Sequence, residues 1–252
     1  MNATAPFKFD LAAYEKDGFT IVPGFLTNEE VAMLRQAATV LEGACGPLVH
    51  ENPRVRIDKI DGAPRPRKIE PLIDLSPEFK ALTQAPKITG IMQSIFNDAP
   101  ALFEDKLNYK YPRGGAEFAL HQDRWYWQNV PARITSVLIY LDEATPENGC
   151  LEVYPGFHQK GLFEMDRKTG ISEAIFAGTP RQQALGAAGT AIVFDSMTPH
   201  LSRENHSNKF RRAIILSYNP KSAGTFYDIG CGLARDAHLK WLSTLPQKLE
   251  TV

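Results

Sequence analysis

The sequence predicts a mainly β fold with flanking helices. Apolar residues recur at helix spacing mostly within the first hundred of the 252 residues. Beyond that point, short runs rich in β-branched and aromatic residues follow one another, separated by Gly, Pro and Asn, as is typical of successive strands. A chain of this length is ordinary for one β barrel or sandwich that carries extra helices. We therefore expect a single domain over residues 1–252, with a helical part of about 1–100, a β core of about 101–220 and a tail of 221–252.

The N-terminal part is predicted to run helix, strand, helix. Residues 19–22 form a short β-like run that Pro23 and Gly24 close. Thr27 is a plausible N-cap for the second helix, and Glu30, three residues later, completes a capping box. Apolar residues then continue at helix spacing, namely Val31, Leu34, Ala38 and Leu41.

Two further segments lie between this helix and the β core. Residues 49–66 are polar and rich in arginine and proline, so we expect a loop that could fold over a pocket. Residues 77–96 predict one or two helices, which the turn residues from Asn97 to Pro100 bring to an end. The candidate buried positions of these helices are Phe79, Leu82, Ile88, Ile91, Met92 and Ile95.

The β core is predicted from five runs of β-branched and aromatic residues, at 101–111, 134–141, 150–154, 190–194 and 211–218. Between them, residues 163–186 are long and weakly patterned, so we expect an insertion or mobile loop. The tail carries Leu239, Leu242 and Leu245 at near-helical spacing, which suggests a closing helix.

Composition excludes several classes of protein. Lysine plus arginine (28) nearly balances aspartate plus glutamate (29), so no broad basic surface for nucleic acid or anionic lipid is expected. The three cysteines form no Cys-x-x-Cys pair, which argues against a zinc ribbon and a disulfide framework and fits a reducing compartment. The charged N-terminus does not resemble a signal peptide, and no stretch is apolar enough to span a bilayer. We expect a soluble, cytoplasmic protein without nucleic-acid or membrane partners.

The most informative feature is His121-Gln122-Asp123, followed far downstream by His200. In an extended segment side chains alternate between faces, so His121 and Asp123 point the same way. His200 follows the apolar run 191–194, where a strand would end at the mouth of a barrel. Two imidazoles and one carboxylate can hold one face of a ferrous ion and leave three positions open. The alternative is a surface hydrogen-bonded pair, because His-x-Asp is frequent by chance.

Arg211 lies eleven residues after His200 (211 − 200 = 11) and begins the last β-like run. Alternation along this run places Arg211 and Arg212 on opposite faces, so one of them faces inward. A guanidinium matches a carboxylate in bidentate geometry, and a buried arginine needs an anionic partner. That partner is either a bound carboxylate ligand or a carboxylate of the protein, such as Glu152 or Asp142.

Several motifs far apart in the chain occur in a characteristic order. They are Asp17-Gly18-Phe19, Val22-Pro23-Gly24-Phe25, His121-Gln122-Asp123, Asn148-Gly149-Cys150-Leu151, Pro155-Gly156-Phe157-His158, His200 and Arg211. With these motifs, which span most of the chain, it resembles the phytanoyl-CoA dioxygenase family of iron(II)/2-oxoglutarate oxygenases. The resemblance implies a double-stranded β-helix, a distorted cupin-like jelly roll, for the β core.

The resemblance also implies roles for individual residues. At the open end of the jelly roll, His121, Asp123 and His200 would bind the iron. The cosubstrate 2-oxoglutarate would be bound by Arg211, Ser202, Asn108 and Phe118, with Arg211 on its distal carboxylate. Asn108 belongs to an even-numbered polar set with Lys106 and Lys110, so the alternative for Asn108 is a solvated strand face.

An aromatic cluster follows the His-x-Asp motif, namely Arg124-Trp125-Tyr126-Trp127. Trp127 matches a position that lines the substrate pocket in ectoine-type relatives, so we expect all four residues near the substrate. They could stack on it or hold a cationic ammonium group, or form a packed lid instead. The stretch from Leu107 to Pro112 is similar to the branch of the family that acts on aminoalkylphosphonates, although Arg113 and the aromatic cluster depart from that branch.

The predicted activity is hydroxylation of an unactivated C–H bond of a small molecule by Fe(II), 2-oxoglutarate and O2, with succinate and CO2 as co-products. The carboxylate of Asp123 disfavours a halogenase, in which relatives leave that position open for chloride. Two alternatives stay open: desaturation, epoxidation or ring formation on the same scaffold in natural-product biosynthesis, and a non-catalytic metal-binding jelly-roll module. The sequence selects neither one substrate, whether natural product, amino acid, aminoalkylphosphonate or CoA thioester, nor an oligomeric state.

Overall fold

Two antiparallel β-sheets pack face to face in the computed structural model, which describes residues 8–44 and 52–227 and positions 237 and 240. The larger sheet has the order β1 (Phe19–Val22), β9 (Ala191–Asp195), β6 (Thr135–Tyr140), β11 (Arg211–Pro220), β4 (Pro100–Lys110), β3 (Ala63–Ile69) and β2 (Val55–Ile60). The smaller sheet has the order β5 (Phe118–His121), β10 (His200–Ser202), β7 (Leu151–Val153) and β8 (Gln182–Ala184). The predicted jelly-roll architecture with flanking helices is confirmed.

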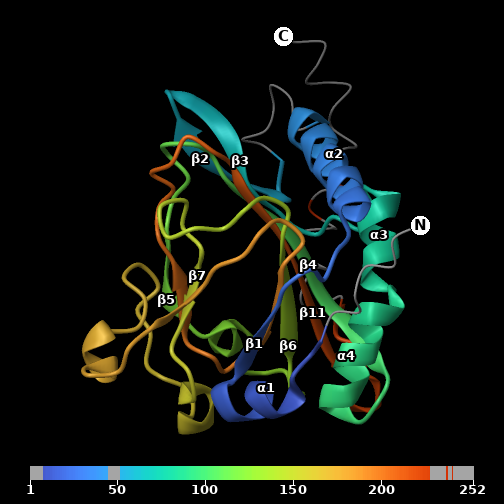
Figure 1. Ribbon diagram of the computed structural model, residues 1–252, viewed down its shortest axis with the longest axis vertical. Coiled ribbons are helices and arrows are strands. Elements are labelled where there is room, and N and C mark those ends of the chain that lie inside the picture. The colour runs from blue at the N-terminus through green and yellow to red at the C-terminus, as the bar shows by residue number, and fades with distance from the viewer. Residues whose placement is uncertain (1–7, 45–51, 228–236, 238–239, 241–252) are drawn as a thin grey trace.

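Within the described residues, four α-helices accompany the sheets, namely α1 (Leu11–Asp17), α2 (Asn28–Ala44), α3 (Pro77–Thr83) and α4 (Pro86–Phe96). Figure 1 shows α2, α3 and α4 along one side of the molecule, next to β4 and β11 and opposite β5 and β7. All six apolar positions expected for residues 77–96 are buried, so this prediction is confirmed as two helices. Asn97, in the left-handed conformation, ends α4. None of the described helices is long and apolar enough to cross a bilayer.

The capping box predicted at the start of α2 is present. The backbone N–H of Thr27 donates to Oε2 of Glu30 at 2.8 Å, and the N–H of Glu30 donates to Oγ1 of Thr27 at 3.2 Å. Glu30 also accepts hydrogen bonds from Nζ of Lys87 in α4, at 2.5 and 2.6 Å. The box therefore fixes the start of one helix and its contact with another, and the predicted order helix, strand, helix is confirmed.

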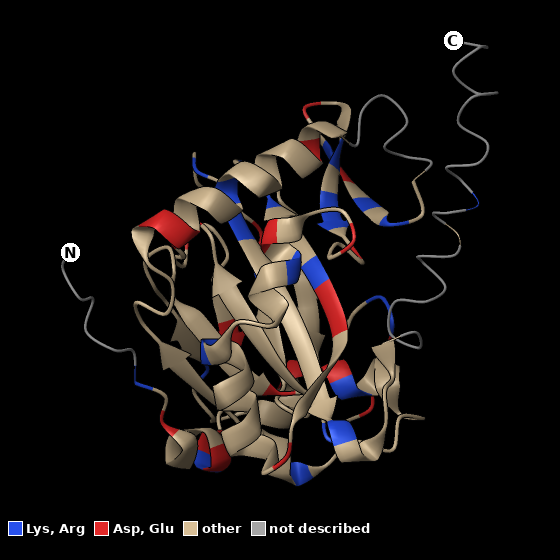
Figure 2. Cartoon of the chain, turned by 90° about the vertical axis from the view of Figure 1, so that its right-hand side faces the viewer, with Lys and Arg blue, Asp and Glu red and all other residues tan. Residues whose placement is uncertain are grey.

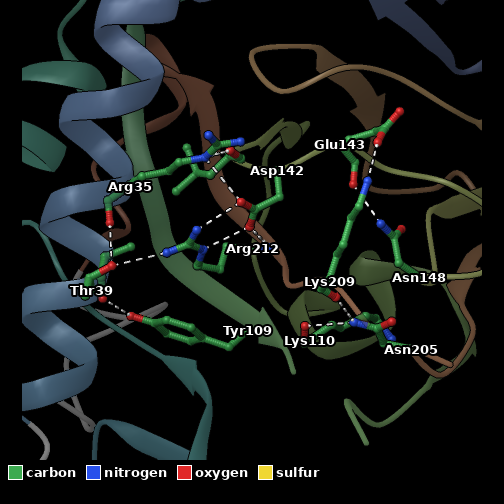
Figure 3. A network of polar contacts seen from close by, with 12 residues as sticks. Arg35, Thr39, Tyr109, Lys110, Asp142, Glu143, Asn148, Asn205, Lys209 and Arg212 are labelled. Atoms are coloured by element: carbon green, nitrogen blue, oxygen red, sulfur yellow. Dashed lines mark hydrogen bonds and ion pairs between the residues drawn. The ribbon is translucent and has the colours of Figure 1, made fainter. Parts of the chain in front are cut away.

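Strand β11 is buried on both faces. Ala213 and Ile215 pack between the two sheets, whereas Ile214 and Leu216 pack against the helices. This is the alternation that the sequence predicts, with Arg211 on the inner face. Arg212, on the outer face, forms a bidentate pair with Asp142 (Nε and Nη2 each at 2.9 Å). Asp142 also binds Arg35 of α2, so the network in Figure 3 fastens the helix to the sheet.

The expectation of a loop over residues 49–66 is wrong for its described part. Residues 55–69 form the hairpin β2–β3, which extends the larger sheet beyond β4. The turn residues Asp61 and Gly62 have φ of +49° and +80°, the conformation that a two-residue hairpin turn requires. Prolines and arginines obscured this Asp-Gly signal, because proline is unfavourable in strands in general but is tolerated where its missing N–H is not needed.

The segment 163–186, expected to be an insertion or mobile loop, contains ordered contacts of its own. Phe176 stacks on Tyr154, the residue directly after β7, with a centroid distance of 4.0 Å. Residues 182–184 form β8. The sequence predicted neither β8 nor β10 as a strand, and each has only three residues. The closing helix proposed around Leu239 lies outside the described residues.

Acidic and basic residues are interspersed along the ribbon in the view of Figure 2. Many of them form pairs of opposite sign, such as Arg133 with Asp195 and Arg181 with Glu152. This distribution follows from the balanced composition and gives the described surface mixed charge.

Candidate metal centre and cosubstrate site

His121, Asp123 and His200 come together where the smaller sheet meets a turn. His121 ends β5 and pairs in register with His200, the first residue of β10. One ligand atom from each of the three residues lies within 4.8 Å of the others. Nε2 of His121 is 3.5 Å from Oδ1 of Asp123, and the two imidazole centroids are 4.2 Å apart.

The expected alternation holds at Gln122 but ends there. Gln122 is extended and points away from the cluster, where its amide donates to the backbone carbonyls of Gly161 and Met197. Asp123 then begins a 3-10 turn, Asp123–Trp127, instead of continuing the strand. The turn keeps the carboxylate on the same side as His121 and carries the aromatic cluster next to it.

Hydrogen bonds fix the tautomer of both histidines. Nδ1 of His121 lies 2.8 Å from the carbonyl of Ala119, and Nδ1 of His200 lies 2.9 Å from the carbonyl of Thr198. A carbonyl can only accept, so each Nδ1 carries the proton and each Nε2 is left with a lone pair. Backbone carbonyls hold metal-binding imidazoles in this way in many metal sites.

The electrostatics of the cluster favour a bound cation. Burial opposes ionisation of Asp123, but Lys106 and the two imidazoles outweigh it and hold the pKa of this carboxyl below its usual range. Burial and the neighbouring His121 lower the pKa of His200 to about 4, which leaves its imidazole neutral at physiological pH. A carboxylate and two imidazole nitrogens form the donor set that suits ferrous iron, so the residues present fit this metal.

Arg211 is buried on the inner face of β11, with 2% of its surface exposed. Nη2 donates to Oγ of Ser202 at 3.0 Å, and this hydroxyl donates to the carbonyl of Gly149 at 3.3 Å. Nε of Arg211 has no hydrogen-bond partner among the described residues. Burial lowers the pKa of Arg211, because no ion pair compensates for the lost water.

The protein carboxylates considered as partners of Arg211 are engaged elsewhere. Asp142 binds Arg212 and Arg35, on the outer face of the larger sheet. Glu152 pairs with Arg181 at 3.2 Å and with Arg203 at 3.8 Å. Among the described residues Arg211 thus has no ion pair, and its donors face a cavity.

This cavity has a volume of about 330 Å³ and is lined by the triad, Arg211 and the other residues expected at the cosubstrate site, Ser202, Asn108 and Phe118. Asn108 is 7% exposed, so the alternative of a solvated strand face is wrong for it. Its Oδ1 has no partner within the described part of the chain. Unpaired donors and acceptors on a concave wall are the feature expected of a polar ligand site.

The four residues of the aromatic cluster separate into two pairs. Trp127 and Tyr126 line the cavity, and Trp127 packs edge-to-face on Phe103 at 4.8 Å. Arg124 instead donates to the carbonyls of Val130 and Ala132, which closes the turn that follows. Trp125 lies outside the cavity, where Arg167 stacks on it at 5.4 Å. The structure therefore brings Trp127 and Tyr126 to the triad and leaves Arg124 and Trp125 outside the cavity.

Sequence reasoning missed a row of charged residues on the cavity wall, namely Lys68, Glu70, Glu104 and Lys106. The even-numbered polar positions of β4 were a usable signal, since Glu104 continues the set of Lys106 and Asn108 by two residues. Lys68 and Glu70 could not be found in this way, because Lys68 lies in β3 and Glu70 directly after it, and the sequence predicted no strand there.

Two of the glycine-containing motifs named in the sequence analysis support the site without lining it. Gly149 has φ of +76°, and a Cβ there would lie 2.2 Å from the carbonyl oxygen of Arg203. Gly156 donates its N–H to the carbonyl of Asp17 at 2.8 Å, which joins two of these motifs. The close approach at Gly149 leaves no room for a side chain, and at Gly156 the φ of +77° favours glycine.

Comparison with known proteins gives a consistent result. The family described as "Phytanoyl-CoA dioxygenase (PhyH)" matches residues 14–213. A methylphosphonate hydroxylase of Gimesia maris is 31% identical over 215 residues, which are 85% of this chain and 81% of the relative. An L-proline trans-4-hydroxylase of Streptomyces griseoviridis is 26% identical, over 87% of this chain and 88% of the relative. The crystal structure of EctD from S. alaskensis with 2-oxoglutarate and 5-hydroxyectoine has a TM-score of 0.73 and 26% identity, covering 84% of this chain and 76% of that one.

Proposed function

The chain belongs to the phytanoyl-CoA dioxygenase family, and on this premise we propose which of its residues carry the reaction. The protein is a 2-oxoglutarate-dependent dioxygenase that hydroxylates a small molecule and uses iron. In the proposed assignment, His121, Asp123 and His200 hold the iron(II), and Arg211, Ser202, Asn108 and Phe118 hold 2-oxoglutarate.

The observation that carries the cosubstrate assignment is the buried guanidinium of Arg211. An unpaired buried charge is strongly destabilising unless an anion joins it. The distal carboxylate of 2-oxoglutarate supplies such an anion, and the free Nε together with a second guanidinium nitrogen matches its two oxygens. A binding module without a cosubstrate has no use for this arrangement beside a metal triad.

Bound iron(II) supplies the oxidation chemistry, in which one oxygen atom of O2 enters succinate, the other enters the hydroxylated product, and CO2 is released. The residues of the chain fix the geometry around it. Arg211 and Ser202 anchor the far end of 2-oxoglutarate and so orient its keto acid toward the triad. Leu138, Leu151 and Ile215 line the same cavity and exclude water from it.

The substrate is a small molecule, and we propose that it lies against Trp127 and Tyr126, the aromatic side chains on the cavity wall. The relatives named for methylphosphonate and L-proline give the first two compounds to assay. Mass spectrometry of the product separates hydroxylation from desaturation, epoxidation and ring formation, because each changes the mass differently.

Substitution Asp123→Ala tests the triad. We expect the wild type, with ferrous iron under air, to release succinate from 2-oxoglutarate in a substrate-stimulated manner, and the variant to lose this stimulation. Removing one of three ligands should also abolish stoichiometric iron binding, measured by metal analysis after gel filtration. Glu204→Ala, which removes a carboxylate that is 59% exposed, serves as the control and should behave as the wild type. Near-normal substrate-coupled turnover of Asp123→Ala would exclude the triad.

A further inference from the structure

The four charged residues on the cavity wall have no role in the iron or cosubstrate assignments. We propose that the substrate carries an oxyanionic headgroup, a phosphonate or a carboxylate, that binds the ammonium group of Lys106. This inference rests on the proposed function and adds the chemical class of the substrate to it.

Each lysine of this row hydrogen-bonds to one glutamate, and Lys106 is the more buried of the two, with 13% of its side chain exposed against 27% for Lys68. Nζ of Lys106 donates to Oε2 of Glu104 at 2.7 Å, its one hydrogen-bond acceptor within the described ranges 8–44 and 52–227. The ammonium carries three N–H groups, and its side chain is 13% exposed. The remaining N–H groups are therefore largely shielded from bulk water and lie at a cavity that a ligand can enter.

The two glutamates between the lysines do not neutralise both of them. Glu70 and Glu104 are hydrogen-bonded to each other, and two carboxyl groups can make that contact only by sharing a proton. Burial raises the pKa of Glu104 well above its usual range, whereas the hydrogen bond from Glu104 and the two lysines overcome the burial of Glu70 and lower its pKa to about 2. Two ammonium groups and one carboxylate charge leave the row with a net charge of +1.

The rest of the cavity does not neutralise this charge. Iron(II) with two positive charges and Arg211 with one balance the two carboxylates of 2-oxoglutarate and that of Asp123. The surplus positive charge of the row thus remains once metal and cosubstrate are in place. A monoanionic headgroup neutralises it, and a low-dielectric cavity makes this attraction strong.

Lys106 and Arg211 arise from well-separated positions along the larger sheet. In the ladder between β4 and β11, Lys106 lies opposite Ile215 and Lys110 lies opposite Arg211. Four residues along the strand pair correspond to about 13 Å. Both side chains line the cavity from these separate backbone positions, so one can anchor the cosubstrate and the other the substrate.

The surroundings of Lys106 place the rest of the substrate. Its Nζ lies 5.8 Å from the ring centroid of Trp127, and Asp123 is among the charges that act on it. A headgroup on Lys106 would thus put the attached carbon chain between the indole and the triad. This is the position from which a C–H bond can reach the metal.

The test measures binding without turnover, by isothermal titration calorimetry under anaerobic conditions on protein loaded with ferrous iron and 2-oxoglutarate. The probes are methylphosphonate, 2-aminoethylphosphonate, propionate and, as an uncharged analogue, propionamide. We expect the wild type to bind at least one of the acids and not propionamide. Comparison of the phosphonates with propionate identifies the kind of oxyanion.

Lys106→Met should weaken binding of the acid by about 10- to 100-fold, the effect of losing a charged hydrogen bond. Lys106→Arg should restore part of it. Lys209→Met makes the same change of charge at a lysine that is 76% exposed and should leave binding unaltered. The affinity for 2-oxoglutarate should be unchanged in all three variants, and this shows that they are folded and that the cosubstrate site is intact.

Glu104→Gln gives a second route to the same question, because glutamine keeps an acceptor for Lys106 and needs no shared proton. Anion binding should be retained in this variant. Three results would overturn this inference and leave the proposed function standing, provided that 2-oxoglutarate binds normally. They are equal affinity for the acid in wild type and Lys106→Met, a preference for propionamide, and binding of none of the acids. Loss of iron-dependent 2-oxoglutarate binding in the wild type itself would instead overturn the proposed function.

Discussion

At the scale of single residues, the chemistry of this protein depends on Arg211. The guanidinium is buried and the residue lines the cavity, its hydroxyl partner Ser202 is fixed by the carbonyl of Gly149, and Nε has no acceptor among the described residues. Such a group is stable only when a ligand completes it. The same side chain therefore both anchors a cosubstrate and makes the empty site electrostatically unfavourable.

Substitution Arg211→Lys should weaken 2-oxoglutarate binding by about 10- to 100-fold, although the positive charge is kept. Lysine cannot reproduce the planar fork that binds both oxygens of a carboxylate, and charged hydrogen bonds are worth about 1.5–3 kcal/mol each. The measurement is the concentration of 2-oxoglutarate that gives half-maximal succinate release. Arg212→Lys is the matched control, since Arg212 faces the helices, and an equal effect of both substitutions would remove Arg211 from this role.

Trp127→Ala should alter substrate coupling more than cosubstrate binding. Trp127 lines the cavity beside Lys106, at the end opposite Arg211 in the strand register. We expect a larger share of 2-oxoglutarate to be consumed without product, measured as the ratio of succinate to hydroxylated product. Trp125→Ala removes the same side chain outside the cavity and should keep the wild-type ratio. An unchanged ratio in Trp127→Ala would favour the alternative that the aromatic cluster is a packed lid.

The part of the site that can be predicted from sequence is the part set by short spacing. His121 and Asp123 share a local segment, so alternation alone places them on one side. Lys106 and Glu70 depend on the pairing of two strands far apart in sequence, which no local pattern encodes. Arg124 and Trp125 were expected near the substrate but lie outside the cavity. They belong to a 3-10 turn, which directs neighbouring side chains differently from the alternation of an extended strand.

At the scale of elements, the capping box of α2 connects local sequence to tertiary packing. The hydroxyl of Thr27 satisfies an N–H at the helix start, and Glu30 returns a hydrogen bond and also binds Lys87 of α4. Thr27→Ala should lower the free energy of unfolding by about 1 kcal/mol. Chemical denaturation checks this value, Thr27→Ser should restore most of the loss, and equal stability of wild type and Thr27→Ala would show that the cap contributes nothing.

Elements were predictable where one periodicity extends over several residues. The buried positions of α3 and α4 and the alternation of β11 follow from the sequence, because the period and the burial agree. The hairpin β2–β3 was missed because its prolines masked an Asp-Gly turn. Strands β8 and β10 were missed for a different reason, since three residues are too few to establish a period. Pairing defines them, of β8 with β7 and of β10 with both β5 and β7.

At the scale of the whole molecule, the helix layer and the inner faces of the two sheets have different roles. The helices bury the outer face of the larger sheet, and the network of Arg212, Asp142 and Arg35 fixes them there (Figure 3). The inner face is then free to carry polar and charged groups around a cavity. Nε of Arg211 and Oδ1 of Asn108 have no hydrogen-bond partner among the described residues, so bound ligands can supply the missing partners.

Binding of metal and of 2-oxoglutarate should therefore stabilise the folded protein, and the stabilisation by 2-oxoglutarate should depend on the metal. A ligand that binds only the folded state at 100 times its dissociation constant adds about 2.7 kcal/mol, and for a chain of this size each kcal/mol raises the unfolding temperature by roughly 2–4 °C. With manganese(II) as a redox-stable substitute for iron, we expect 2-oxoglutarate to raise the midpoint of thermal unfolding by about 5–10 °C. Without metal the rise should be much smaller, because the metal held by the triad forms part of the binding site for 2-oxoglutarate. In Asp123→Ala the metal should no longer raise the unfolding temperature. In Arg211→Lys the metal should still raise it, but most of the further rise caused by 2-oxoglutarate should be lost. Equal shifts by 2-oxoglutarate in wild type and Arg211→Lys would place the cosubstrate elsewhere, because linkage allows no stabilisation without differential binding.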